Sequence, residues 1–431
     1  MAAFRNKVVV FSHDLVGPRM AGPGVRYYRL AQALAREFEV VLVAPAGSEP
    51  AGELPLLTFR TGADPTVGAA VRKAHVAVVP VSLVPHLPVL AEEPWVPVVV
   101  DGYDPLLAET LMLGADADAV RSAQTLAALR GDFFICAGER QRDWWLGWLE
   151  AVGRVNPHTW AEDPTLRRLV DVVPSGIPDE PLPACVPVAR RIWPDLPADA
   201  ELLLWGGGLW PWLDPLTAIR ALVRIRAVRP QACLIFPGVR HPNPGMVNIP
   251  THHDAAVSLA RSLGLLGRAV FFSEWTPYSD WPGLLAESRV GLSLHLDTVE
   301  ARLAFRGRIL DYIWAALPVV ATRGDETAGW VERYGLGILV EPGDEAGVAR
   351  AALTLLGLPR ESLHSNFEAA RRALSWSEAV RPLMAFCRMP RCAPDRVQRD
   401  GAPAGPSAAG DGSVGRRGDW VNRLRRWLAG S

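Results

Sequence analysis

Residues 202–215 read LLLWGGGLWPWLDP, and this stretch decides the fold. The apolar run 202–205 predicts a buried strand. Asp214 followed by Pro215 predicts the start of a helix, because aspartate caps helices and proline suits their first turn. A strand, a glycine-rich loop and a helix form the opening βα unit of a doubly wound domain. A tight turn needs fewer glycines, so we expect a ligand to approach the backbone closely at Gly206, Gly207 and Gly208.

The same alternation of short apolar runs and helical stretches extends along the whole chain of 431 residues. It predicts further strands in the second half at 232–236, 269–272, 290–294, 317–321 and 337–340. In the first half it predicts strands at 8–11, 40–44, 76–79, 96–100, 133–137 and 170–173, with helices such as 25–38 between them. Strands that alternate with helices indicate parallel sheets. The fold class is therefore α/β, with two Rossmann-like doubly wound domains.

Composition shifts mark the expected boundaries. We expect a first domain over residues 1–180, a proline-rich linker over 181–200, a second domain over 201–361 and a helical region over 362–392. Residues 393–418 are rich in Ala, Gly, Pro and Ser, which predicts disorder. Residues 419–431 regain helical periodicity, with Trp420, Leu424, Trp427 and Leu428 on one face among arginines. Such a tail helix suits either an anionic membrane surface or the surface of the protein itself.

Composition and charge exclude several classes of protein. A hydrophobic content of 49% and a net charge of −1 indicate a packed globular protein without a field that would collect nucleic acid. Five scattered cysteines without a CxxC pattern predict no zinc site and a reduced, cytoplasmic compartment. The N-terminal apolar run is too short for a signal peptide, and no run reaches the length of about 18 residues that a membrane-spanning helix needs. Asp116-Ala-Asp118 matches a metal-binding DxD motif, but helix capping by Asp116 explains it better.

Two further segments carry candidate ligand contacts. The loop Gly17-Pro-Arg-Met-Ala-Gly22-Pro-Gly24 precedes a helix expected to begin near Val25, and its free N–H groups suit a diphosphate or a sugar; a βα loop that only turns is the alternative. Residues 300–322 predict a loop, a helix from about Phe305 to Ala315 and a buried strand. Arg306 and Arg308 in the first turn oppose the helix dipole, which favours a bound anion. A surface ion pair of Arg308 with Asp311 is the alternative.

The run DYIWAALPVVAT from Asp311 to Thr322, with Gly324-Asp325 and Pro342-Gly343-Asp344 downstream, resembles the nucleotide-binding end of the large retaining glycosyltransferases of family four. The resemblance implies the GT-B architecture, in which two such domains face each other across a cleft. It implies that Asp311 binds the donor ribose and that residues 303–306, Phe305 included, receive the diphosphate. Residues 17–29 resemble the acceptor-side loop, and FFSEWTP at 271–277, with Trp275, resembles the base-contacting segment. Ser375-Trp376-Ser377 resembles the start of the helix that crosses back to the first domain.

Three departures from the family pattern concern the expected site. Leu303 stands where the family has a glutamate, so Glu300 is the expected substitute. Leu209, Trp210 and Trp212 stand where the family has an arginine and a lysine, so Arg306 and Arg308 are expected to meet the diphosphate. Where the family has a histidine, this chain has Asp101 and Asp104. Either aspartate is expected to bind an acceptor hydroxyl or to act as base, unless Asp104 only caps the helix that follows Pro105.

Three other residues are candidate ligand contacts. Glu139 and Arg140 follow a predicted strand and suit either a contact with donor or acceptor or a structural ion pair. His295 ends another predicted strand, where a ligand role and a hydrogen-bonded structural role are equally open.

The resulting hypothesis is a glycosyltransferase of cell-envelope polysaccharide biosynthesis that is retaining and uses neither a metal nor a cofactor. It would transfer a hexose from a nucleotide sugar to a glycan, lipid-linked or small-molecule acceptor. It would be cytoplasmic, with peripheral contact to the inner membrane through the tail helix. The alternatives are an epimerase of the same fold, which should gather more acids and histidines around the sugar, and an inactive subunit that binds a partner.

Overall fold

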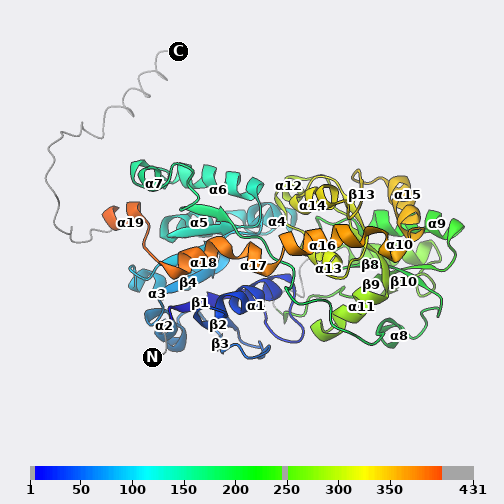
Figure 1. Cartoon of the computed structure of the whole chain (residues 1–431), viewed down its shortest axis with the longest axis horizontal. Coiled ribbons are helices and arrows are strands. Elements are labelled where there is room, and N and C mark those ends of the chain that lie inside the picture. The colour runs from blue at the N-terminus through cyan, green and yellow to red at the C-terminus, as the bar shows by residue number, and fades with distance from the viewer. Residues whose placement is uncertain (1–4, 245–250, 400–431) are drawn as a thin grey trace, which may run out of the picture. The chain divides into compact units, whose positions relative to one another are not determined.

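Two parallel sheets organise the chain (Figure 1). The structure is a computed structural model that describes residues 5–244 and 251–399. The first sheet has seven strands in the order β3-β2-β1-β4-β5-β6-β7. The second has six strands in the order β10-β9-β8-β11-β12-β13. In both sheets every neighbouring pair is parallel, which confirms the predicted α/β architecture.

The strands lie within two or three residues of their predicted positions, except β3, which the sequence analysis missed. The strands of the first sheet are β1 (Lys7–Phe11), β2 (Glu39–Pro45), β3 (Leu56–Phe59), β4 (Val76–Pro80), β5 (Val98–Asp101), β6 (Phe133–Cys136) and β7 (Val170–Val172). Those of the second are β8 (Glu201–Trp205), β9 (Ala232–Phe236), β10 (Val270–Phe272), β11 (Ser288–Ser293), β12 (Val319–Thr322) and β13 (Gly337–Val340).

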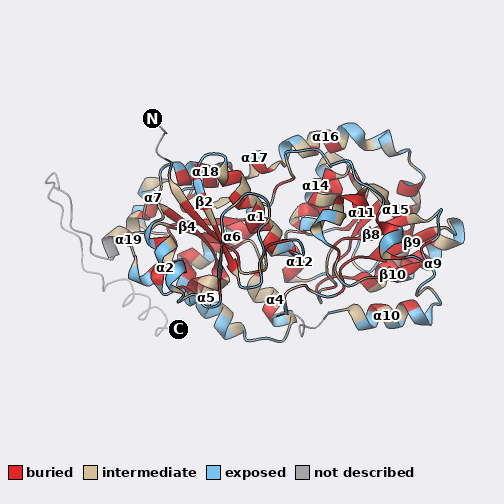
Figure 2. Ribbon diagram, turned by 90° about the horizontal axis from the view of Figure 1, so that it is seen from below, coloured by how far each residue is buried: buried red, intermediate tan, exposed pale blue. Residues whose placement is uncertain are grey.

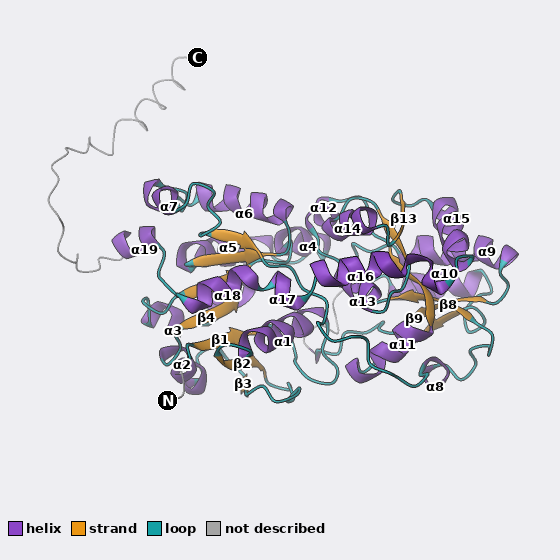
Figure 3. Cartoon of the chain, viewed as in Figure 1, coloured by secondary structure: helices purple, strands orange, loops and turns teal. Residues whose placement is uncertain are grey.

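Helices cover both faces of each sheet, and the buried residues concentrate on the strands and on the inward faces of these helices (Figures 2 and 3). In the first domain α1 (Gly22–Ala35) and α18 (Arg381–Arg388) pack on one face, and α2 (Pro65–Arg72), α5 (Ala117–Arg130) and α6 (Glu139–Ala151) on the other. In the second, α9 (Pro215–Val228) and α15 (Glu345–Leu356) pack on one face, and α13 (Gly307–Trp314) and α16 (His364–Ala373) on the other. The remaining α-helices are α3 (Val89–Glu92), α4 (Leu106–Met112), α7 (Pro157–Glu162), α8 (Ala189–Ile192), α10 (His253–Ser262), α11 (Trp281–Glu287), α12 (Val299–Leu303), α14 (Glu326–Tyr334), α17 (Trp376–Ala379) and α19 (Pro394–Arg399).

The strand order reverses its direction of growth between β1 and β4 in the first sheet and between β8 and β11 in the second. Open α/β sheets bind ligands beyond the carboxyl ends of the strands at such a point. The loops after β1 and β8 are the two glycine-rich loops that the sequence singled out. The fold therefore brings both loops to the positions where a ligand is expected.

Helix capping follows the local sequence at two of three predicted positions. Asp214 accepts a hydrogen bond from the backbone N–H of Thr217 at 3.0 Å, with Pro215 as the first residue of α9. Asp116 caps α5 in the same way, as predicted. The capping alternative for Asp104 is wrong, because α4 begins at Leu106 and its N-cap residue is Pro105.

The C-terminal helices pack on both domains in turn. Helix α16 contributes Phe367 to the core of the second domain, whereas α17 and α18 pack in the core of the first. The chain passes between the domains at Trp376, whose N–H donates to the carbonyl of Ile177 at 2.9 Å. Within the described ranges, no helix is long and apolar enough to cross a membrane.

The expectation of disorder from residue 393 onward is wrong for its first residues. Residues 394–399 form α19, and Arg396 is 2% exposed because it donates to both oxygens of Asp132, at 2.8 and 2.7 Å. Arg154 and Asp395 form a second ion pair of 2.6 Å beside it. The rest of the predicted linker and the predicted tail helix at 419–431 lie outside the described residues.

Candidate functional site

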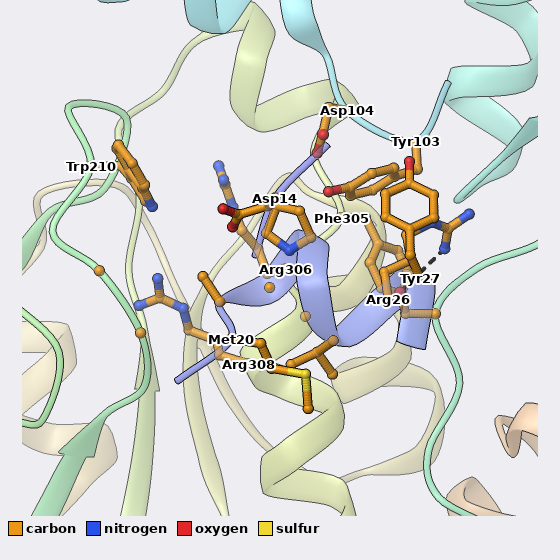
Figure 4. Close-up of a pocket in the computed structure, with 18 of the residues that line it drawn as sticks. Asp14, Met20, Arg26, Tyr27, Tyr103, Asp104, Trp210, Phe305, Arg306 and Arg308 are labelled. Carbon is orange, nitrogen blue, oxygen red and sulfur yellow. Dashed lines mark hydrogen bonds between the residues drawn. The ribbon is translucent and has the colours of Figure 1, made fainter. Parts of the chain in front are cut away.

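One cavity of about 530 Å³ is lined by residues from the strand ends of both sheets (Figure 4). Most of the residues predicted for the site line it, but Gly24 and Glu300 do not. In the view of Figure 4, Arg308 and Trp210 lie on one side of the cavity, and Asp104 and Tyr103 lie on the other. The predicted residues that line it are Gly22, Asp101, Asp104, Gly206, Gly207, Gly208, Trp275, Phe305, Arg306, Arg308 and Asp311.

The glycine loop after β8 runs beside α13. The N–H of Gly206 donates to the hydroxyl of Tyr312 at 2.8 Å, and a Cβ at Gly206 would lie 2.9 Å from that oxygen. Gly207 has a φ of +83°, which favours glycine. A Cβ on Gly207 would lie 3.7 Å from Nη2 of Arg308, so the loop and this guanidinium are neighbours. The absence of side chains at this loop thus leaves room directly beside a cation.

Arg308 is a half-buried cation with no anionic partner among the described residues. The predicted ion pair with Asp311 is wrong: within the described residues Arg308 forms no salt bridge, and its Nη1 has no hydrogen-bond partner. Its guanidinium lies over the ring of Trp205, 5.1 Å from the centroid. Burial lowers the pKa of Arg308 to about 10, since the charged form is desolvated. The arrangement suits an anionic ligand.

Arg306, in contrast, is held by a carboxylate. Its Nη1 and Nη2 donate to the two oxygens of Glu300 at 2.8 and 2.7 Å. The predicted loop around Glu300 is the short helix α12, and α13 begins at Gly307, two residues later than predicted, with Arg306 as its N-cap. Glu300 is 1% exposed, and both its oxygens are engaged. The structure therefore gives Glu300 the role of positioning Arg306, and the expectation that it substitutes for the family glutamate is not supported by this geometry.

Asp311 faces the cavity from α13. Its Oδ2 accepts a hydrogen bond from Nε1 of Trp281 at 2.9 Å. Burial raises the pKa of Asp311 to about 6, although this hydrogen bond and the nearby Arg29 and Arg308 act in the opposite direction. No described residue donates a hydrogen bond to its Oδ1, and a carboxylate in this position can accept hydrogen bonds from a diol. Trp275, on the loop after β10, lies 5.7 Å from the ring of His241 and completes this wall.

The first domain contributes two aspartates, one with an arginine partner among the described residues and one without. Asp101 is 2% exposed and accepts two hydrogen bonds from Arg26, at 2.7 and 2.9 Å, so it positions this arginine. Arg26 in turn lies over the ring of Tyr103, 4.5 Å from the centroid. Asp104 forms no ion pair within the described residues. Burial raises its pKa to about 7, which makes Asp104 the better candidate for proton transfer.

A histidine and aspartate cluster at the end of β1 was not predicted. Asp14 is 4% exposed, accepts from Nδ2 of Asn243 at 2.8 Å and lies 3.4 Å from Nε2 of His241. His13 packs edge-on against Tyr27, and burial lowers its pKa. The sequence signal was Ser12-His13-Asp14 directly after the first strand, a position where ligands are expected. All but Ser12 of these residues line the cavity or its rim.

No protein-family model and no curated protein matches this sequence. Solved structures do match. Anabaena HepE, solved with UDP and glucose, is 16% identical with a TM-score of 0.65 over 89% of this chain and 99% of HepE. Sucrose-phosphate synthase from Thermosynechococcus elongatus is 15% identical with a TM-score of 0.62 over 89% and 98%. WaaG, a glycosyltransferase involved in lipopolysaccharide biosynthesis, is 18% identical with a TM-score of 0.57 over 89% and 99%.

The chain has the GT-B fold. In this fold the two sheets face each other across the cavity described above, so the acceptor-side and donor-side expectations map onto opposite walls. The helix at the first wall begins earlier than predicted, at Gly22. Gly24 lies inside α1, where a Cβ would stand 2.1 Å from the carbonyl oxygen of Leu15. Its lack of a side chain serves helix packing, and only Gly22 remains available to a ligand.

The remaining candidates have structural roles in this GT-B chain. Glu139 forms an ion pair of 2.8 Å with Arg167, and Arg140 donates to the carbonyl oxygens of Arg302 and Gly324. His295 is 2% exposed; its Nδ1 lies 2.9 Å from the carbonyl oxygen of Leu296 and its Nε2 3.4 Å from Asp325. None of the three predicted residues lines the cavity.

Proposed function

We propose that this protein is a glycosyltransferase that moves a sugar from a nucleoside diphosphate sugar to an acceptor, with retention and without a metal ion. One observation carries the proposal: the guanidinium of Arg308, with its Nη1 buried, lies beside the glycine loop after β8 and has no anionic partner among the described residues. Partial burial of a cation without a partner is costly, and its position beside a backbone that admits a ligand favours an anionic substrate group. A diphosphate has the charge and size for this place.

The donor would occupy the wall formed by the second sheet. Arg308 and the first turn of α13 would bind the diphosphate, because N–H groups at a helix N-terminus and a guanidinium both stabilise phosphate oxygens. Asp311 would accept hydrogen bonds from the ribose hydroxyls, and Trp275 would contact the base. HepE was solved with UDP and with UDP-glucose, which supports a nucleotide sugar as donor.

The chemistry follows from the charge that develops when the glycosidic bond breaks. The sugar becomes oxocarbenium-like and the departing diphosphate gains negative charge, so fixed positive charge lowers the barrier. Arg308 meets the oxygens that gain charge. For retention, the acceptor oxygen bonds to the anomeric carbon on the face from which the diphosphate departs, as the bond to the diphosphate breaks. Asp104, whose pKa is about 7, would accept the proton of the acceptor hydroxyl on that face. The acceptor would bind on the side of the first domain. We propose a cytoplasmic glycan, lipid-linked sugar or small molecule, used in the synthesis of cell-envelope polysaccharide.

A second candidate, an epimerase acting on the nucleotide sugar itself, is favoured by one specific observation. An epimerase was expected to gather acids and histidines around the sugar, and His13, Asp14, His241 and Asp104 all line the cavity. Such groups can remove and return protons on the sugar. The two candidate functions predict different products when the sugar nucleotide is incubated without an acceptor.

Titration calorimetry with a panel of nucleoside diphosphates tests the donor site. We expect one of them to bind at micromolar concentration, and absence of any binding would favour an inactive subunit. The preferred sugar nucleotide is then incubated with the full chain and followed by proton NMR. If the sugar nucleotide is consumed slowly alone and faster when an acceptor is added, the protein is a transferase. If a second sugar nucleotide appears without any acceptor, the protein is an epimerase.

A further inference from the structure

The acceptor half of the cavity contains two carboxyl groups without a positive partner. Asp104 follows β5, and Glu109 lies on α4 five residues later. Both are partly buried and both line the cavity. Within the described part of the chain, neither forms a salt bridge. The hydroxyl of Tyr103 is the hydrogen-bonding neighbour of Asp104.

Four other carboxylates of this protein, all buried or nearly so, each form an ion pair with an arginine. Asp101 is paired with Arg26, Glu300 with Arg306, and Asp132 with Arg396, at distances of 2.7 Å in each case. A fourth pair joins Asp395 to Arg154 at 2.6 Å. Burial of an unpaired carboxylate is costly, which accounts for these arginines. Among the described residues, these four carboxylates each have an arginine, and buried Asp214 has a backbone N–H donor instead, whereas Asp104 and Glu109 have no cation within ion-pair distance.

A neighbouring amide adds an independent observation. Gln124, on α5, is 1% exposed, lines the same cavity, and has a side-chain oxygen without a hydrogen-bond partner. Buried polar atoms are normally satisfied, so an orphaned amide in a cavity wall indicates a missing ligand group. An ammonium group has three N–H donors and no acceptor. Two carboxylates and an amide oxygen are the acceptors that such a group requires.

The charge around this wall points the same way. Arg26 and Arg306, the arginines that act on Asp104 and Glu109, already form ion pairs with Asp101 and Glu300. Burial and the mutual repulsion of these carboxylates raise the pKa of Glu109 well above its usual range. Arg308, the cation without an anion, belongs to the donor wall. The cavity therefore has one half suited to an anion and one half suited to a cation.

We propose that the acceptor of this enzyme carries a protonated amino group, which binds between Asp104, Glu109 and Gln124. This inference rests on the proposed transferase function and specifies its acceptor class. Amino sugars and other polyhydroxylated amines fit, because their hydroxyl groups supply the nucleophile while the ammonium group fixes their orientation. Asp104 then contributes both to binding of the ammonium group and to deprotonation of the hydroxyl.

Matched acceptor pairs test the proposal. Glucosamine and glucose, galactosamine and galactose, and the corresponding N-acetyl sugars are titrated into the full chain saturated with its nucleoside diphosphate. We expect at least one free amine to bind about tenfold or more tighter than both its hydroxyl and its N-acetyl counterpart. In Glu109→Gln this preference should fall to within about twofold, whereas it should persist in Glu150→Gln, which alters an exposed acid on α6.

The pH dependence gives a second readout that a structural role of Glu109 would not produce. Amine affinity should decline as the pH falls through the raised pKa values of Asp104 and Glu109, while affinity for the neutral sugars should stay constant. The charged groups that face this pair are Asp101, Glu300, Arg26 and Arg306, together with the hydroxyl of Tyr103. Equal binding of every amine and its counterparts, no binding of any amine, or a preference that survives Glu109→Gln would each overturn the proposal. If the protein in that experiment still binds its nucleoside diphosphate, only the proposed acceptor class is wrong. If it binds no nucleotide, the proposed transferase function is wrong as well.

Discussion

Replacement of Arg308 by methionine should raise the stability of the free protein and weaken its affinity for the diphosphate. Methionine keeps the length of the side chain and its packing over Trp205 but removes the charge. Burial lowers the pKa of Arg308 to about 10, so the guanidinium stays charged at neutral pH and its desolvation opposes folding. One pKa unit corresponds to about 1.4 kcal/mol, and partial exposure to the cavity reduces the effect. We expect Arg308→Met to stabilise the free protein by about 1–3 kcal/mol.

The bound state should respond in the opposite direction. Charge-assisted hydrogen bonds contribute about 1.5–3 kcal/mol each, which corresponds to a loss of about 10- to 150-fold in diphosphate affinity. Urea denaturation measures the stability, and calorimetry compares the preferred nucleoside diphosphate with its nucleoside, which lacks the phosphates. Affinity for the nucleoside should not change. If Arg308→Met destabilises the free protein, or weakens the nucleoside and the diphosphate equally, Arg308 is a packing residue and the reasoning fails.

Three further predictions follow from the same structure. Asp311→Ala should weaken nucleotide binding by about 1.5–3 kcal/mol in calorimetry, because the ribose loses a charged acceptor, and an unchanged dissociation constant would reject this role. Wild-type kcat/KM should fall as the pH drops through about 7, where Asp104 gains a proton, and this step should be absent from the residual activity of Asp104→Asn; the same step in both proteins would assign it to another group. Arg396→Met should lower the free energy of unfolding by about 1.5–3 kcal/mol in urea, while nucleotide affinity stays the same, since Asp132 loses one of its two arginines and keeps Arg130 at 3.2 Å; an unchanged free energy of unfolding would mean that Arg130 alone satisfies Asp132.

The elements that could be predicted from sequence are those whose signal is local. Continuous apolar runs identified every strand of both sheets except β3, whose four residues include an exposed Thr58 at a sheet edge. Asp214 with Pro215 fixed the start of α9 because a cap involves only neighbouring residues. The two glycine loops pointed to the cavity because parallel strands place their carboxyl ends at one edge. Local signals therefore predicted the architecture and the place of the site.

Roles within the site depend on pairing, and pairing is tertiary. Arg306 and Arg308 are equivalent in the sequence, yet only Arg306 meets a carboxylate, because α12 turns Glu300 back toward it. Asp101 and Asp104 are equally acidic in sequence, and Arg26 from a distant helix decides between them. Helix α19 was missed because its stability comes from ion pairs with the first domain. The periodicity of apolar residues in a sequence does not predict such long-range ion pairs.

The same pairing makes Arg306 the most informative residue for separating catalysis from structure. Arg306→Ala alone leaves Glu300 buried without its partner, which should cost about 3–5 kcal/mol of stability. Lower turnover in this variant would then have two explanations. The double variant Arg306→Met with Glu300→Gln removes both charges and should recover most of the lost stability.

Turnover of the double variant decides between these explanations. Arg306 lines the cavity, where its positive charge can meet charge that grows on the departing diphosphate, although its Nε also lies 3.7 Å from Oδ2 of the buried Asp325. We expect the stable double variant to remain on the order of 100-fold slower than wild type in kcat, with KM for the donor changed by no more than about twofold. Recovery of kcat together with stability would show that Arg306 only holds α12 and α13 in place. A change confined to KM would mean that Arg306 binds the donor equally in the ground state and in the transition state.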